Sequence, residues 1–148
     1  MQAGEVACPL YYASLGGLAN TVSRLVEEGA DVNAQGGEFG NALQAASAEG
    51  RDKIVDILLS KGASVNGQGG FYGNALQAAL AEGHDMIVQM LLSIGANVNA
   101  QGGEFGNALQ AASAKGHDKI VDMLLSKGAN VNGQGDYSNA LCAASAKG

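Results

Sequence analysis

Short apolar stretches of two kinds alternate along this chain. Residues 42–49, ALQAASAE, are mostly small and apolar and follow Asn41, a residue type that favours helix N-termini. Gln44 lies three positions after Asn41, so we expect a capping box in which the two side chains reciprocally satisfy free backbone N–H groups. Gly50 follows and suits the left-handed conformation that ends many helices. The pattern predicts a short helix over residues 42–49.

A second, more amphipathic pattern follows in residues 52–61, DKIVDILLSK. Its large apolar residues are spaced so that they share one face of a helix: Ile54, Val55, Leu58 and Leu59. Asp52 suits the first turn of this helix, and Gly62 suits its end. Residues 63–72, ASVNGQGGFY, then contain one Asn-Gly and one Gly-Gly pair, which supply positive φ angles. We therefore expect a second helix followed by an extended, turned connection.

This two-helix unit is repeated. The sequence GNALQAASAEG from Gly40 returns with few changes at Gly73 and Gly106, and as SNALCAASAKG at Ser138. A period of 33 residues is typical of stacked helical repeats. Two short helices cannot bury their own apolar face, so stability must come from packing between copies. The sequence predicts an all-α solenoid of helix-turn-helix units with short hairpin loops, with repeats at residues 7–40, 41–73, 74–106 and 107–138 and a partial fifth repeat at 139–148.

The last unit has a first helix but no second helix within the sequence. Its apolar face around Leu141 is then left without a covering repeat. We expect the chain to be a piece of a longer array, and we also expect that this open repeat allows end-to-end self-association.

Composition and charge restrict the classes of partner. The chain has 8 Lys and Arg against 14 Asp and Glu, a net charge of −6, which argues against nucleic acid, because binding its phosphates needs clustered cations. No run of 18 apolar residues indicates a membrane span, and the N-terminus lacks the pattern of a secretory signal. Cys8 and Cys142 lie near opposite ends of the array, too far apart for a disulfide. We expect a soluble cytoplasmic protein.

The sequence offers no catalytic or metal-binding constellation. His84 and His117 occupy equivalent positions in adjacent repeats, about 8–10 Å apart at the usual helix-packing distance, which is too far for both to ligate one metal ion. The glycine pairs follow turns and do not fit the strand-to-helix context of a phosphate-binding loop. We predict no enzyme, no cofactor and no metal site.

The repeat unit resembles the ankyrin repeat. Residues 116–132, GHDKIVDMLLSKGANVN, follow its consensus TPLHxAAxxGHxxIVxxLLxxGADVNA, and matches recur in register over nearly the whole chain. The main departure is Asn-Ala-Leu-Gln in place of Thr-Pro-Leu-His, which keeps a good helix cap. The GNALQAAS spelling and the near-identity of the copies are similar to the ankyrin arrays of fungal NOD-like receptors. This resemblance implies the sensor part of a larger intracellular receptor involved in non-self recognition; the alternatives are a structural spacer or self-assembling scaffold, and a designed consensus protein without a natural partner.

The resemblance also implies that a protein or peptide partner contacts the hairpin tips and the exposed positions of the first helices. Recurring rings at Phe39, Phe71 and Phe105 favour packing on the neighbouring hairpin. The better contact candidates in the tips are Glu38, Tyr72, Glu104 and Tyr137. On the first helices, small residues such as Ala45 and Ala48 predict a shallow groove with a charged rim, although that rim is equally explained as a solvated surface. The full set of candidate contact residues is Tyr12, Glu38, Phe39, Glu49, Phe71, Tyr72, Glu82, Glu104, Phe105, Lys115, Asp136 and Tyr137.

Overall fold

The computed structural model describes residues 7–132 of the chain. Within these residues the regular structure is helical, apart from two isolated β-bridges, so the predicted all-α class is confirmed. Each pair of helices is joined by a short turn and followed by a longer connection. The described helices are α1 (Pro9–Gly16), α2 (Ala19–Glu27), α3 (Ala42–Glu49), α4 (Asp52–Ser60), α5 (Ala75–Glu82), α6 (Asp85–Ser93), α7 (Ala108–Lys115) and α8 (Asp118–Ser126).

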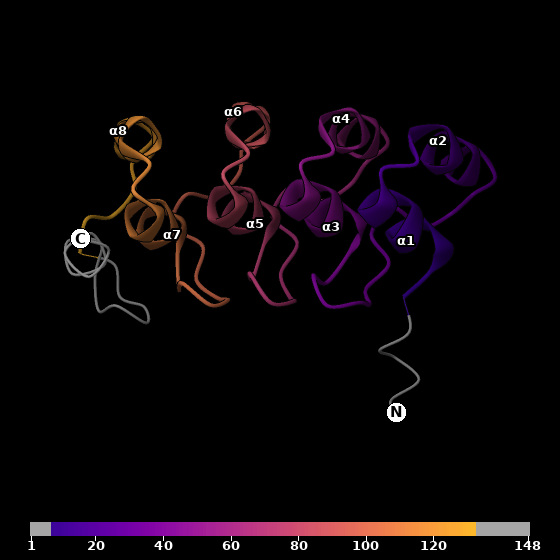
Figure 1. Cartoon of the computed structure of the whole chain (residues 1–148), viewed down its shortest axis with the longest axis horizontal. Coiled ribbons are helices and arrows are strands. Elements are labelled where there is room, and N and C mark those ends of the chain that lie inside the picture. The colour runs from indigo at the N-terminus through magenta and orange to yellow at the C-terminus, as the bar shows by residue number, and fades with distance from the viewer. Residues whose placement is uncertain (1–6, 133–148) are drawn as a thin grey trace.

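The helices stand in two rows (Figure 1). An inner row contains α1, α3, α5 and α7, and an outer row contains α2, α4, α6 and α8. The long connections project from the inner row on the side away from the outer row. Successive pairs stack side by side along the array, so residues 33 positions apart occupy equivalent places in neighbouring units.

The inner helices begin and end as their sequence predicts. The side chains of Asn41, Asn74 and Asn107 each accept a hydrogen bond from the backbone N–H three residues later, at 2.9, 2.8 and 2.8 Å. The reciprocal half of the predicted capping box is wrong. The side-chain Nε2 of Gln44 instead donates to the carbonyl of Gly67 at 3.2 Å, and its Oε1 has no hydrogen-bond partner. The glutamine therefore links its helix to the following connection and does not close its own N-terminus.

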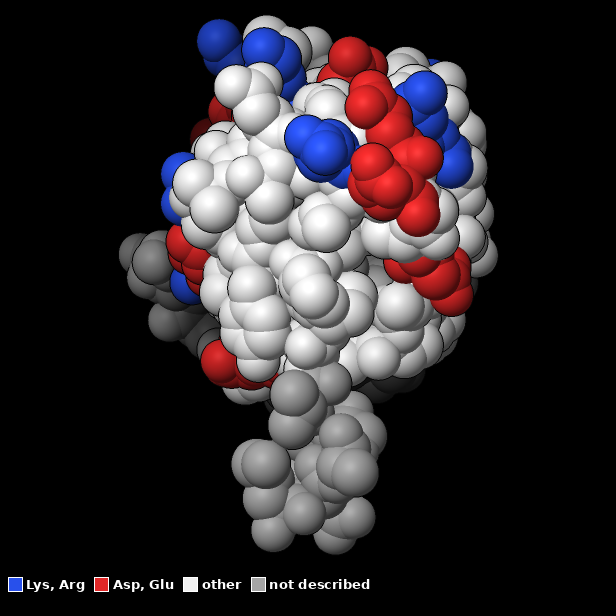
Figure 2. Space-filling view, turned by 90° about the vertical axis from the view of Figure 1, so that its right-hand side faces the viewer, with Lys and Arg blue, Asp and Glu red and all other residues white. Residues whose placement is uncertain are grey.

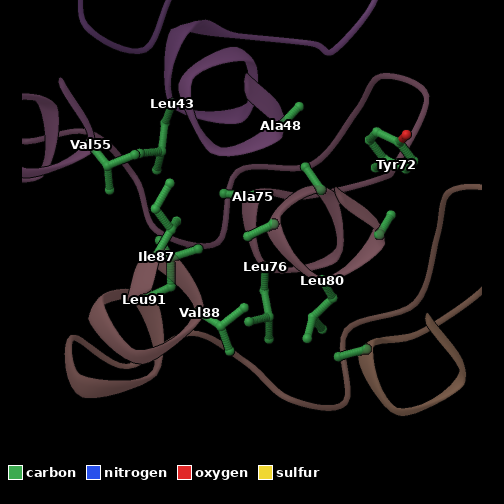
Figure 3. Close-up of a cluster of buried hydrophobic side chains, with 14 of the residues drawn as sticks. Leu43, Ala48, Val55, Tyr72, Ala75, Leu76, Leu80, Ile87, Val88 and Leu91 are labelled. Atoms are coloured by element: carbon green, nitrogen blue, oxygen red, sulfur yellow. The ribbon is translucent and has the colours of Figure 1, made fainter. Parts of the chain in front are cut away.

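The core runs as one large cluster along the array, beside a small second cluster of Ala7, Tyr11 and Ala45. The outer helices bury one face each, and in α4 that face is Ile54, Val55 and Leu58. Figure 3 shows Leu43 and Val55 approaching from one repeat and Ile87 and Leu91 from the next. Burying each large aliphatic side chain contributes about 1.5–3 kcal/mol, and this burial depends on the neighbouring copy. Stacking between repeats thus provides the core that no single unit has.

The inner helices α3, α5 and α7 are buried nearly all round, which contradicts the predicted shallow groove. Ala45 and Ala48 have relative exposures of 0% and 4%, and their equivalents in α5 and α7 reach at most 8%. Ala48 lies in the main cluster and Ala45 packs with Tyr11 of α1, and such small side chains allow the inner helices to approach closely. They form the inside of the array and offer no groove to a partner.

A ladder of asparagines, absent from the sequence interpretation, ties successive repeats together. Asn33, Asn66 and Asn99 each accept a hydrogen bond from a backbone N–H 31 residues later, at 2.8, 2.7 and 2.8 Å. Each also donates from Nδ2 to a glycine carbonyl 29 residues later, at 3.1–3.3 Å. Asn66 thus bridges two repeats from within a turn, which the N–H of Gly67 closes on the carbonyl of Ser64 at 3.3 Å. The positive-φ glycines of this connection are Gly62, Gly69, Gly70 and Gly73, so the glycine of the Asn-Gly pair is not among them.

Candidate protein-interaction surface

The long connections end in tight hairpin tips. In the first tip the N–H of Gly36 donates to the carbonyl of Gly40 at 2.9 Å. The same closure joins Gly69 to Gly73 at 3.0 Å and Gly102 to Gly106 at 2.9 Å. Each closed tip carries two consecutive side chains at its end, which are Glu38-Phe39, Phe71-Tyr72 and Glu104-Phe105.

Neighbouring tips are fixed against one another through their backbones. The N–H of Phe71 donates to the carbonyl of Glu38 at 2.9 Å, and the N–H of Glu104 donates to the carbonyl of Phe71 at 3.1 Å. A Cβ atom on Gly70 would lie 2.2 Å from the carbonyl oxygen of Phe39, so only glycine fits this contact. The tips therefore form a continuous row in which the order of the side chains is fixed.

The second position of each tip carries the packing ring. Phe39 stacks on Tyr72, with ring centroids 5.8 Å apart and an interplanar angle of 4°. Tyr72 and Phe105 are buried, and Phe39 is partly buried against the core. The packing role predicted for Phe39 and Phe105 is confirmed.

The first position of each tip faces solvent, and here the sequence interpretation needs correction. Glu38, Phe71 and Glu104 are exposed, with Phe71 at 46% relative exposure, whereas Tyr72 is at 9%. The rings at Phe71 and Phe39 are not in register, because 33 residues after Phe39 the chain reaches Tyr72. Packing is therefore the wrong prediction for Phe71, and Tyr72 is not the exposed ring of its tip. Counting the period from Phe39 would have found this.

Side chains at the ends of the inner helices reach the packing rings. The hydroxyl of Tyr72 donates to the carboxylate of Glu82, and the ammonium of Lys115 lies 5.6 Å from the centroid of the Phe105 ring. The pKa of Tyr72 is raised well above its usual range, first by burial, then by the hydrogen bond to Glu82, and then by the charges of Glu82, Glu104 and Glu38. Glu82 and Lys115 are exposed, as is the equivalent Glu49. These positions line the row of tips on the inner-helix side.

The first repeat departs from this scheme. Tyr11 takes the place that glutamine has in α3, α5 and α7, and its hydroxyl accepts a hydrogen bond from the N–H of Phe39 at 3.1 Å. Tyr12 is exposed and makes an edge-on contact with Tyr11. At the end of the array formed by α1 and α2, most visible charged side chains gather towards the outer row, and a few others lie along the left edge of the view (Figure 2).

Arg51 and His84, which occupy one recurring position, have structural partners. Nε2 of His84 lies 3.0 Å from the carbonyl of Ala48, and Nε of Arg51 donates to the carbonyl of Leu15 at 3.2 Å. Each thus links the start of an outer helix to the end of the inner helix of the preceding repeat. In the part of the chain that is described, no three or more His, Cys, Asp or Glu side chains gather as a metal-binding group.

Some sequence predictions fall outside residues 7–132. Asp136, Tyr137, Leu141 and Cys142 lie there, whereas Cys8 is free and partly buried. None of the helices in the described range has the length and apolar character needed to cross a membrane.

Comparison with known families agrees with the geometry. The family model described as Ankyrin repeats (3 copies) matches residues 3–69 and 68–135. The chain therefore belongs to the ankyrin repeat family, whose members are typically protein-interaction modules without catalytic activity. No curated protein matches the chain.

Proposed function

We propose that the chain is the ligand-recognition part of a larger intracellular fungal receptor of the NOD-like type, and that it binds a protein or peptide through its row of hairpin tips. The observation that carries this proposal is the fixed row itself. Glu38, Phe71 and Glu104 project from backbones that are hydrogen-bonded to one another, so a partner meets a surface that needs no ordering on binding. A rigid row with exposed charged and aromatic side chains has the character of a recognition surface.

The pattern of variation between repeats supports the sensor role. Residues 41–66 and 107–132 differ at four positions, which are Glu49/Lys115, Arg51/His117, Ile57/Met123 and Ser64/Asn130. The first of these pairs lies beside the tips and reverses its charge. Near-identical units with different side chains beside the tips suit a receptor whose specificity changes by duplication and substitution of repeats. We place the repeat boundaries of this receptor segment near residues 7–40, 41–73, 74–106 and 107–138.

Capture from a fungal extract tests this function. Two baits are compared, the parent chain and a variant of the solvent-facing tip side chains, called the rim variant, which carries Glu38→Gln, Phe71→Ala and Glu104→Gln. A matched control carries three exposed outer-row changes, Lys53→Ala, Asp56→Ala and Lys119→Ala. We expect mass spectrometry to find a protein retained by the parent and by the outer-row control but not by the rim variant. Equal retention by the rim variant would remove the tips as the binding surface.

A further inference from the structure

Phe71 is an exposed ring placed between two carboxylate residues. The equivalent positions of the tips on either side carry Glu38 and Glu104, and both are exposed. The backbone of Phe71 is hydrogen-bonded to Glu38 on one side, at 2.9 Å, and to Glu104 on the other, at 3.1 Å, so the three side chains leave the row from directly neighbouring tips. The ring and both acids can therefore contact a single side chain of a partner.

The ring of Phe71 is held in place by its contact with Tyr72, which is itself packed and hydrogen-bonded. Its ring meets the ring of Tyr72 edge-on, with centroids 4.9 Å apart and an interplanar angle of 76°. Tyr72 in turn stacks on Phe39 and donates a hydrogen bond to Glu82. An exposed aromatic side chain held in this way loses little conformational freedom when a partner binds.

The negative charge around Phe71 has no cation paired with it among residues 7–132. Glu82 accepts a hydrogen bond from the Tyr72 hydroxyl of the middle tip, and Glu38 and Glu104 belong to the two tips whose backbones are hydrogen-bonded to it. The one ion pair of the described residues joins Arg24 to Glu28 on α2, away from the tips. With a net charge of −6 for the whole chain, the row attracts a basic partner.

The array itself shows a cation resting on a tip ring. The ammonium of Lys115 lies 5.6 Å from the centroid of Phe105, within the range of a cation–π contact. At Phe71 the ring is more exposed, and the neighbouring side chains are acids that would pair with such a cation.

We propose that Glu38, Phe71 and Glu104 form a receptor site for a basic segment of the partner protein. An arginine or lysine side chain of the partner lies on the Phe71 ring and pairs with Glu38 and Glu104. Arginine fits this site better than lysine, because the guanidinium is planar, stacks on aromatic faces and presents several donors to carboxylates. The inference rests on the proposed function, since it specifies what the row of tips binds.

A selection from a displayed library of random dodecapeptides tests the two proposals separately. The library is selected on the parent chain, and each enriched peptide is then compared on the rim variant with Glu38→Gln, Phe71→Ala and Glu104→Gln. We expect enrichment of arginine and lysine in peptides that lose binding to the variant. Neutral or acidic peptides that depend on the rim would overturn the basic-partner inference and leave the proposed function standing. Peptides indifferent to the rim variant, or no enriched peptides, would overturn both.

Synthetic forms of one enriched peptide then isolate the contributions. Replacing its arginine with citrulline keeps the shape and removes the charge, and should weaken binding. Phe71→Ala should weaken binding about two- to five-fold, the value of an exposed cation–π contact. Phe71→Glu removes the ring and adds a third acid, so the affinity of this variant for the peptide shows whether stacking on the ring or charge attraction alone holds the arginine. Equal affinity for the citrulline peptide, or affinity undiminished by Phe71→Ala, would overturn the inference; circular dichroism confirms that each variant is folded.

Discussion

The close contact between neighbouring hairpin tips makes Gly103 the most informative glycine of the row. Gly103 has a φ of +73°, and an added Cβ would lie 2.1 Å from the carbonyl oxygen of Tyr72. Gly116 has nearly the same φ, +74°, with no atom within 4 Å of the Cβ position. The two glycines therefore impose the same backbone strain on alanine but differ in the space available to it.

We predict unequal losses from the two substitutions. Gly116→Ala should lower the free energy of unfolding by about 1–2 kcal/mol, the cost of a left-handed conformation for an L-residue. Gly103→Ala adds an overlap of backbone atoms and breaks the nearby hydrogen bond from the N–H of Glu104 to the carbonyl of Phe71, which together cost about 1.5–4.5 kcal/mol more. Urea denaturation followed by circular dichroism measures the difference. Hydrogen exchange at the Glu104 amide should accelerate in Gly103→Ala alone. Equal losses of stability in both variants would refute the tight contact between tips.

Further predictions concern the polar links of the array. Asn66→Ala removes two hydrogen bonds between repeats and should lower the free energy of unfolding by about 1–3 kcal/mol; a urea midpoint unchanged from the parent would contradict the ladder. Gln77→Met should leave the melting temperature unchanged or raise it, because both amide atoms of this buried side chain lack hydrogen-bond partners. Gln110→Met breaks a 3.0 Å hydrogen bond to the carbonyl of Phe105 and should lower the melting temperature. A lower melting temperature for Gln77→Met than for Gln110→Met would contradict these contacts. The fold raises the pKa of Tyr72 above the ordinary value of about 10, so this group leaves the free energy of unfolding unchanged below that pH and lowers it as the pH rises further. Tyr72→Phe should flatten this decline in a series of denaturation curves between neutral and alkaline pH. An unchanged decline would contradict the raised pKa.

Local patterns were enough to predict the repeat unit. Asn41 and Gly50 mark the ends of α3 because capping and left-handed termination act within a few residues. The apolar stripe of α4 is readable for the same reason, since its spacing follows the helix itself. The stacking of units follows from repetition and from the small size of each helix pair.

Contacts between repeats were less accessible to sequence reasoning. The partners of Asn66 lie 29 and 31 residues away, so nothing in its own connection reveals that this turn residue also bridges two repeats. Ala45 is small and apolar in either setting, and its burial depends on how closely the neighbouring inner helix approaches. The exchange of roles between Phe71 and Tyr72 arose because adjacent aromatic residues are both suited to packing, and only the strict period of 33 separates them.

The most direct test of the row of tips as a recognition surface is chemical-shift mapping by NMR with a defined probe. The probe is the peptide Ac-GSRGSRGSRG-NH2, compared with the same peptide carrying citrulline in place of arginine. The proposed site predicts that the arginine peptide shifts the resonances of Glu38, Phe71 and Glu104, and that the citrulline peptide leaves them in place. Shifts centred on the outer row around Asp56 and Asp122, or equal shifts with both peptides, would contradict the proposed surface.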